Sequence, residues 1–186
     1  MKFVPTLDKD FRPMYLEFKA YKEEVASAAH KPLKICVERN DGYNYIYSYD
    51  IFVSADKSER NNRMAERMIK TILWVVGGYK VYICGDEGVY NYIKDAYTAQ
   101  GIRAFDKGFM ERVYESPFEV INVSEKEFPA EKKCSLKVGG HLDGCRIGFD
   151  AGGSDRKVSA VVDGKVVYSE EVVWFPKTNP DPNYHY

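Results

Sequence analysis

The spacing of apolar residues over residues 1–123 predicts a domain of strands and helices. Apolar side chains recur every three or four residues in some segments, as in amphipathic helices, and run together or alternate in others, as in strands. The expected helices are Met14–Ala29, Ser58–Val76, Glu87–Tyr97 and about Lys107–Tyr114, and the expected strands are Leu33–Arg39, Tyr43–Val53, Tyr79–Cys84 and Phe118–Val123. This order predicts a small α/β domain with a mixed sheet.

Residues with strong turn and capping preferences mark the ends of these elements. Asp56, followed three residues later by Glu59, indicates a capped start for the helix at Ser58. Gly77 favours the end of that helix, because glycine is the usual residue at helix ends. The sequence Lys31-Pro32 is expected to stop the first helix, and Asn40–Gly42 fits a hairpin turn.

The segment Ser124–Lys133 is the most polar stretch of the chain and contains Pro129. Polar segments with a proline are typical of domain boundaries, so we expect a linker over residues 124–144. The linker would separate the N-terminal domain, residues 1–123, from a C-terminal part, residues 145–186.

The C-terminal part reads as a β-hairpin with a glycine-rich tip, followed by a second tight turn. A strand-like run ends at Asp150, and the chain then passes through Gly152-Gly153-Ser154 into a second run, Lys157–Val162. The sequence turns at Asp163-Gly164 and resumes as a strand over Lys165–Tyr168. Glycine lets backbone N–H groups approach an anion, and a preceding carboxylate can hold a hydrated cation, which suggests a phosphate with its magnesium.

A hairpin alone is marginally stable in water. It therefore packs on residues 1–123, pairs with another copy of the chain, or opens a longer domain. We favour the last alternative.

Composition excludes few classes of protein. The formal net charge is −1 over 186 residues, so no general excess of positive charge indicates a nucleic-acid partner. No apolar run approaches the roughly 20 residues of a membrane span, and the N-terminus lacks a signal-peptide core, so we expect a cytoplasmic protein with no membrane contact. The chain has four cysteines that lie far apart and without C-x-x-C spacing, namely Cys36, Cys84, Cys134 and Cys145. We expect them to be reduced structural thiols.

Two further patterns each allow a structural and a functional interpretation. Tyrosines alternate along one strand, at positions 43, 45, 47 and 49. They either seal the edge of a core or form an interface, for example between two copies of the chain. Cys134, His141 and Cys145 could ligate zinc with a fourth group, although their spacing is not a common zinc signature; we favour the structural interpretation of both patterns.

The segment Asp150-Ala151-Gly152-Gly153-Ser154, with Asp163-Gly164 after it, resembles the first phosphate motif of the actin, hexokinase and Hsp70 ATPase superfamily. It is most similar to the ROK family of bacterial sugar kinases and sugar-responsive regulators, whose pattern is D-x-G-G-T. The resemblance implies that residues 145–186 form the opening hairpin of an actin-like, ribonuclease H-like ATPase fold. Serine in place of threonine keeps the hydroxyl group.

By this resemblance, Asp150 lies near Mg²⁺ and contacts it through water. The backbone of Gly152, Gly153 and Ser154 and the Ser154 hydroxyl contact the phosphates of ATP, and Lys157 stands where hexokinase-like proteins carry a basic residue near phosphate. Asp155 departs from the family, which often has lysine or asparagine there, and a carboxylate at this point repels a triphosphate unless a cation intervenes.

The resemblance predicts the N-terminal part of an ATP-dependent sugar kinase that transfers phosphate from Mg-ATP to a hexose hydroxyl. The family's catalytic aspartate, second phosphate motif, adenosine motif and zinc-binding cysteines all follow the hairpin, and none fits into the residues after Glu171. No catalytic residue is therefore assigned, and we expect the chain by itself to be inactive. The alternative is a non-catalytic binding or interaction module with a nucleotide-binding fold.

Overall fold

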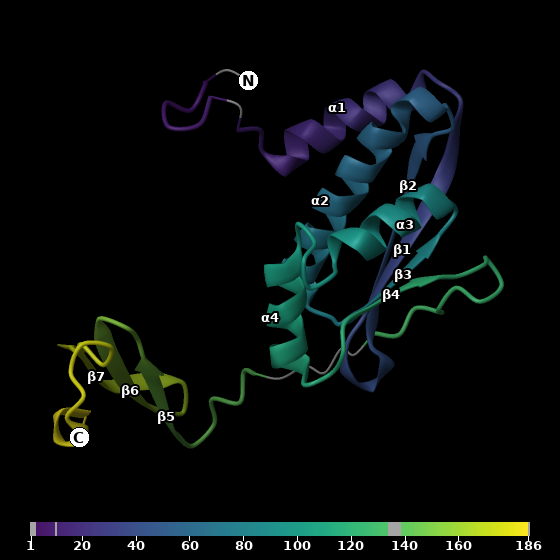
Figure 1. Cartoon of the computed structure of the whole chain (residues 1–186). Coiled ribbons are helices and arrows are strands. Elements are labelled where there is room, and N and C mark those ends of the chain that lie inside the picture. The colour runs from purple at the N-terminus through teal and green to yellow at the C-terminus, as the bar shows by residue number, and fades with distance from the viewer. Residues whose placement is uncertain (1–2, 10, 134–138, 186) are drawn as a thin grey trace. The chain divides into compact units, whose positions relative to one another are not determined.

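The computed structural model of the chain describes residues 3–9, 11–133 and 139–185. The chain divides into two compact units, Met1–Cys134 and Ser135–Tyr186. The first unit contains helices α1 (Met14–Ala26), α2 (Ser58–Val76), α3 (Glu87–Ala96) and α4 (Ala104–Tyr114), strands β1 (His30–Glu38), β2 (Asn44–Phe52), β3 (Lys80–Cys84) and β4 (Glu119–Asn122), and 3₁₀ turns at Asn40–Gly42 and Ala55–Lys57 (Figure 1). It is a mixed α/β unit.

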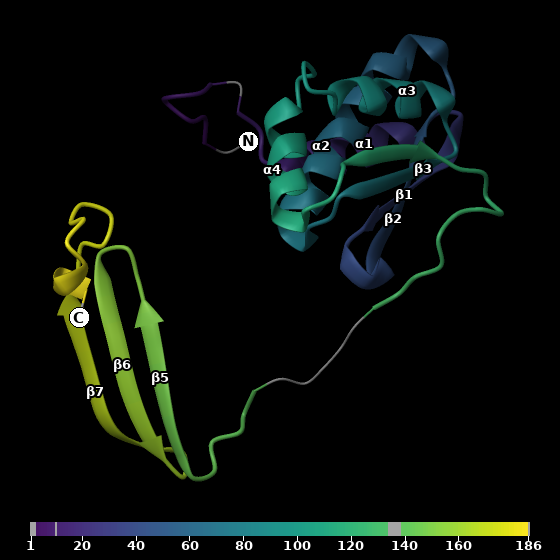
Figure 2. The ribbon, with the colours of Figure 1, turned by 60° about the horizontal axis from the view of Figure 1, so that its bottom comes forward.

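Strands β1–β4 form one mixed sheet in the order β2-β1-β3-β4. Strand β1 is antiparallel to both β2 and β3, whereas β3 and β4 are parallel. Figure 2 shows the helices together on one side of this sheet. The strand residues that face the helices are fully buried and include Leu33, Ile35, Ile51, Val81 and Ile83, so the core lies between the sheet and the helix layer.

The opposite face of the sheet is crossed by the segment that follows β4. Glu125 forms an ion pair with Lys34 of β1 and accepts a hydrogen bond from the Cys84 thiol of β3. Farther along, the Asn44 side chain of β2 donates to the Ala130 carbonyl over 2.9 Å and accepts from the Lys132 backbone N–H over 3.1 Å. Residues 124–133 are therefore held against the first unit.

This attachment corrects the expected linker, because the first ten residues of the range 124–144 belong to the first unit. A polar segment can be a linker, or it can pack on a sheet whose groups bond to its polar atoms, and the sequence pattern alone does not distinguish the two.

Two residues expected to mark the ends of helices have other roles in the structure. Asp56 does not cap α2, since its carboxylate accepts a hydrogen bond from Ser54 and the helix start has no side-chain cap. Pro32 lies within β1, at a position that pairs only with β2 and so loses no bond to β3.

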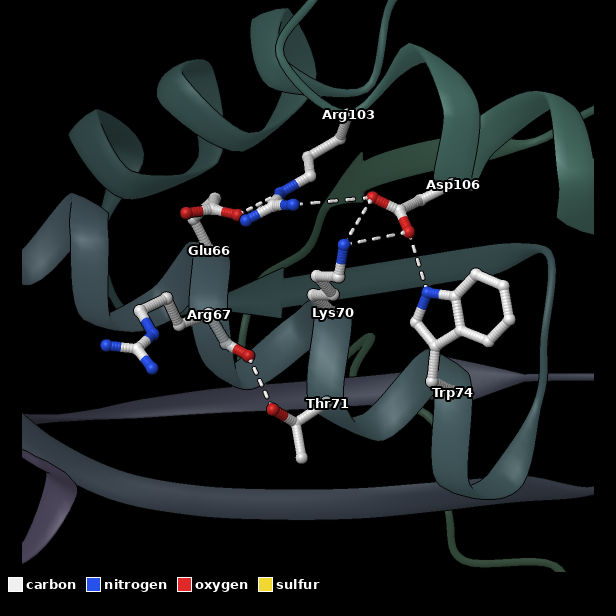
Figure 3. A network of polar contacts seen from close by, with 7 residues as sticks. All are labelled: Glu66, Arg67, Lys70, Thr71, Trp74, Arg103 and Asp106. Atoms are coloured by element: carbon white, nitrogen blue, oxygen red, sulfur yellow. Dashed lines mark hydrogen bonds and ion pairs between the residues drawn. The ribbon is translucent and has the colours of Figure 1, made fainter. Parts of the chain in front are cut away.

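A polar network around two buried carboxylates joins α4 to α2 (Figure 3). Glu66 and Asp106 are only 5% and 2% exposed. Arg103 bridges the two carboxylates, with its Nη1 3.5 Å from Asp106 Oδ2. Lys70 Nζ lies 3.3 Å from Asp106, and Trp74 Nε1 donates to Asp106 Oδ1 over 2.6 Å. The network satisfies charges that would be costly to bury unpaired.

The second unit is a three-stranded antiparallel sheet in the order β5-β6-β7, with strands β5 (Cys145–Ala151), β6 (Asp155–Val162) and β7 (Lys165–Val173) and a final 3₁₀ turn at Pro182–His185. The expected hairpin and second tight turn are confirmed, and β7 extends beyond Tyr168. The sheet leaves large apolar side chains exposed, among them Ile147 at 80% and Phe149 at 67%. None of the helices in the described residues is long and apolar enough to cross a membrane.

Replacing Asp106 is expected to destabilise the first unit. In Asp106→Ala, Lys70 and Trp74 lose a partner and Arg103 loses one of two, so the free energy of unfolding should fall by about 2–4 kcal/mol. Urea unfolding followed by Trp74 fluorescence, in a Trp174→Phe background, measures this change. Asp95→Ala is the control, because the exposed Asp95 carboxylate has no ion-pair partner among the described residues; equal losses in the two variants would contradict the structural role.

Candidate functional site

The residues singled out from the sequence meet at the turn between β5 and β6. Asp150 pairs with Lys157 across the two strands, and Lys157 pairs with Glu171 of β7. Paired residues point to the same side of a sheet, so these three side chains lie in a row on one face. The glycine-rich turn, residues 152–154, begins one residue pair beyond this row, after Ala151 and Arg156.

The turn requires glycine at position 152 but not at position 153. A Cβ atom built on Gly152 would lie 2.7 Å from the carbonyl oxygen of Asp155, so the turn itself excludes a side chain there. A Cβ atom on Gly153 would meet only the flexible side chain of Lys177, with its Cε 3.8 Å away. Neither glycine has a left-handed backbone conformation. The fold therefore does not require glycine at 153, where the missing side chain leaves the backbone open to a ligand.

Lys157 is already engaged by carboxylates. Its Nζ donates to Asp155 Oδ1 over 3.1 Å and lies 3.6 Å from Glu171 Oε1. The hydrogen bond to Asp155, together with the charges of Asp155 and Glu171, raises the pKa of Lys157. The lysine that the resemblance implied for phosphate thus has its charge balanced within the sheet.

Asp150 and Ser154 keep their polar side-chain groups available. Both residues are exposed, and within the described part of the chain no group hydrogen-bonds to the Asp150 carboxylate or the Ser154 hydroxyl. The Ser154 carbonyl accepts from the Trp174 backbone N–H over 2.9 Å, which ties the segment after β7 to the turn. That segment brings Lys177 next to Gly153. Sequence reasoning missed Lys177 because no motif marks it, and its position depends on this backbone contact.

The residues present fit a magnesium ion that arrives with a nucleotide. Mg²⁺ in such sites keeps several waters and takes one or two carboxylates plus phosphate oxygens, and the exposed Asp150 supplies one carboxylate beside the open backbone of Gly153. Within residues 3–9, 11–133 and 139–185, no group of three or more His, Cys, Asp or Glu side chains is arranged to hold a metal. In the zinc alternative, Cys134 lies outside the described residues, whereas His141 and Cys145 are exposed.

The tyrosine-rich strand β2 contributes mainly to the core. The Tyr47 and Tyr49 rings pack against Phe18 of α1, with ring centroids 6.1 and 5.3 Å apart. Burial raises the pKa of Tyr49 well above its ordinary value. Tyr45 is 38% exposed, so self-association through this hairpin stays a prediction for the exposed end of the strand.

The two glycines give a matched pair of variants for the turn. Gly152→Ala is expected to destabilise the second unit by about 1–3 kcal/mol, because the new methyl group meets a backbone carbonyl oxygen. Gly153→Ala should change its stability by less than about 0.5 kcal/mol, because the new methyl group would be in ordinary contact with the Lys177 side chain, 3.8 Å away, and would meet no backbone atom. Urea unfolding followed by Trp174 fluorescence, in a Trp74→Phe background, compares the two variants. Equal destabilisation would show that glycine at 153 serves the fold.

Comparison with protein-family models and with curated proteins adds no relative to this picture. A scan against protein-family models finds no match to the chain, and a search of the curated proteins finds no significant match. The functional assignment of the turn therefore rests on its own residues, Asp150–Lys157, and on their geometry.

Proposed function

We propose that the chain supplies the first phosphate-binding loop of a ROK-like, ATP-dependent sugar kinase with an actin-like ATPase fold. Such an enzyme transfers a phosphoryl group from Mg-ATP to a hexose hydroxyl. The observation that carries the proposal is the position of Gly153: an open glycine that the fold does not require, in a turn flanked by the exposed Asp150 carboxylate. An open backbone beside a carboxylate suits a phosphate with its cation.

Each residue of the loop has a distinct role in this proposal. The backbone N–H groups of Gly152, Gly153 and Ser154 and the Ser154 hydroxyl donate to phosphate oxygens, and Asp150 orients Mg²⁺ through its water shell. Magnesium, when bound with ATP, neutralises phosphate charge. The loop itself acts by positioning and charge stabilisation, which dominate phosphoryl transfer. The group that takes the proton from the sugar hydroxyl is not assigned to this chain.

The second candidate function is a non-catalytic relative that uses the same fold for binding or interaction. The observation that favours it is the Asp155 carboxylate, which holds Lys157 and places negative charge beside the turn. A loop in which carboxylates outnumber the nearby cationic side chains repels free phosphate. The two candidates differ in one property, since only the kinase-like protein requires the loop to bind Mg-ATP.

Titration of the ¹⁵N-labelled chain with Mg-ATP separates the two candidates. The kinase-like protein should show saturable shifts of the backbone amide signals of Gly152, Gly153 and Ser154. Asp150→Ala should raise the dissociation constant at least about tenfold, the effect of losing a contact to a charged group. Glu170→Gln is the control, because Glu170 pairs with Val158 and therefore lies on the opposite face of the sheet.

Binding that Asp150→Ala leaves unchanged would contradict the role of Asp150. Absence of saturable shifts in the unmodified chain would favour the non-catalytic module.

The repulsion by Asp155 is tested by removing its charge. Asp155→Asn should lower the dissociation constant for Mg-ATP roughly fivefold, since two unit charges about 4 Å apart in water interact by about 1 kcal/mol. Asp143→Asn makes the same change in net charge at an exposed residue that pairs with Arg146, outside the turn, and should leave the affinity unchanged. The same titration reports both variants. Equal affinities for Asp155→Asn and the unmodified chain would show that Asp155 does not oppose phosphate.

A further inference from the structure

The segment after β7 folds back onto the glycine-rich turn. The Trp174 backbone N–H donates to the Ser154 carbonyl over 2.9 Å, immediately after β7 ends at Val173. Three residues later, Lys177 lies over Gly153: a Cβ atom built on that glycine would be 3.9 Å from Lys177 Nζ. A second lysine therefore stands beside the turn, on the open side of the glycine that the fold does not require.

Local contacts hold this segment in place. The backbone N–H groups of Thr178 and Asn179 both donate to the Phe175 carbonyl over 3.3 Å, so the chain turns tightly around Lys177. The Phe175 N–H donates to the Tyr184 hydroxyl over 3.1 Å, and the Trp174 indole N–H lies 3.1 Å from His185 Nδ1. The position of Lys177 is thus fixed by its backbone, while the side chain remains exposed and adjustable.

The two lysines beside the turn differ in their electrostatic state. Lys157 contacts both Asp155 and Glu171. Lys177 has no hydrogen-bond or ion-pair partner among the described residues. A cation that already has two carboxylate partners adds little attraction for an incoming anion, whereas an unpaired cation keeps its full attraction.

We propose that Lys177, rather than Lys157, supplies the cationic contact to phosphate at this turn. Its ligand is the di- or triphosphate group of a magnesium nucleotide, seated on the backbone of Gly152–Ser154. The ammonium group of Lys177 contacts the phosphate from the side of Gly153, and Asp150 at the end of β5 orients the metal through its water shell. This inference rests on the proposed function, because it names a further binding residue of the same loop.

One charge-matched pair of variants and one double variant test the inference by the Mg-ATP titration. Lys177→Gln should raise the dissociation constant at least about tenfold, because it removes a hydrogen bond to a charged group. Lys165→Gln makes the same change in net charge at the first residue of β7, at the end of the sheet away from the glycine-rich turn, and should have no effect. Asp155→Asn combined with Lys157→Gln removes an opposite pair of charges and should leave the affinity within about threefold of the unmodified chain.

Each outcome decides a separate point. If Lys177→Gln binds as tightly as Lys165→Gln, the role of Lys177 is overturned, while the proposed function stands on binding by the unmodified chain. If the double variant loses affinity and Lys177→Gln does not, Lys157 is the phosphate contact. If the unmodified chain shows no saturable binding, the proposed function fails and the inference fails with it. Retained dispersion of the amide spectrum verifies that each variant is folded.

Discussion

The antiparallel register of β5 and β6 is the constraint on which the candidate site depends. It sets Asp150 opposite Lys157, and both point to the same face of the sheet. Because side chains alternate along a strand, a shift of one residue would send one of them to the opposite face. The turn reinforces the register, since Gly152 lies so close to the Asp155 carbonyl that only glycine fits. The geometry of the loop follows from strand pairing rather than from a buried core.

The balance of charge around the turn decides what it can bind. On one face of the sheet, next to the turn, Asp150, Asp155 and Glu171 surround Lys157, so this end of that face carries an excess of negative charge. The segment after β7 changes this balance by bringing Lys177 next to Gly153. Magnesium would supply the remaining positive charge. The loop is thus suited to a metal-bound phosphate rather than to a free one.

Local patterns predicted most of the elements, whereas long-range contacts had no signal in the sequence. Helix α2 has the predicted bounds, and Asp163-Gly164 forms the predicted turn, because helical periodicity and left-handed turn residues are properties of short segments. The pairing of Glu66 with Arg103 joins residues 37 positions apart. The contact of Lys177 with the turn depends on the path of the chain after β7. Asp150, the glycines and the repulsive charge of Asp155 could be named as candidates from the sequence, whereas the ion pair between Lys157 and Glu171 and the approach of Lys177 to Gly153 could not.

The most direct test of the central claim replaces magnesium by paramagnetic Mn²⁺ in a titration with ATP. Mn²⁺ broadens the signals of nearby nuclei, so it locates the metal that accompanies the phosphates. If the glycine-rich turn holds a metal-bound phosphate, amide signals of residues 150–154 should broaden first, and those of the Asp163-Gly164 turn should stay sharp. Equal broadening at both turns, or broadening that is the same without ATP, would contradict a metal-phosphate site at Gly152–Ser154.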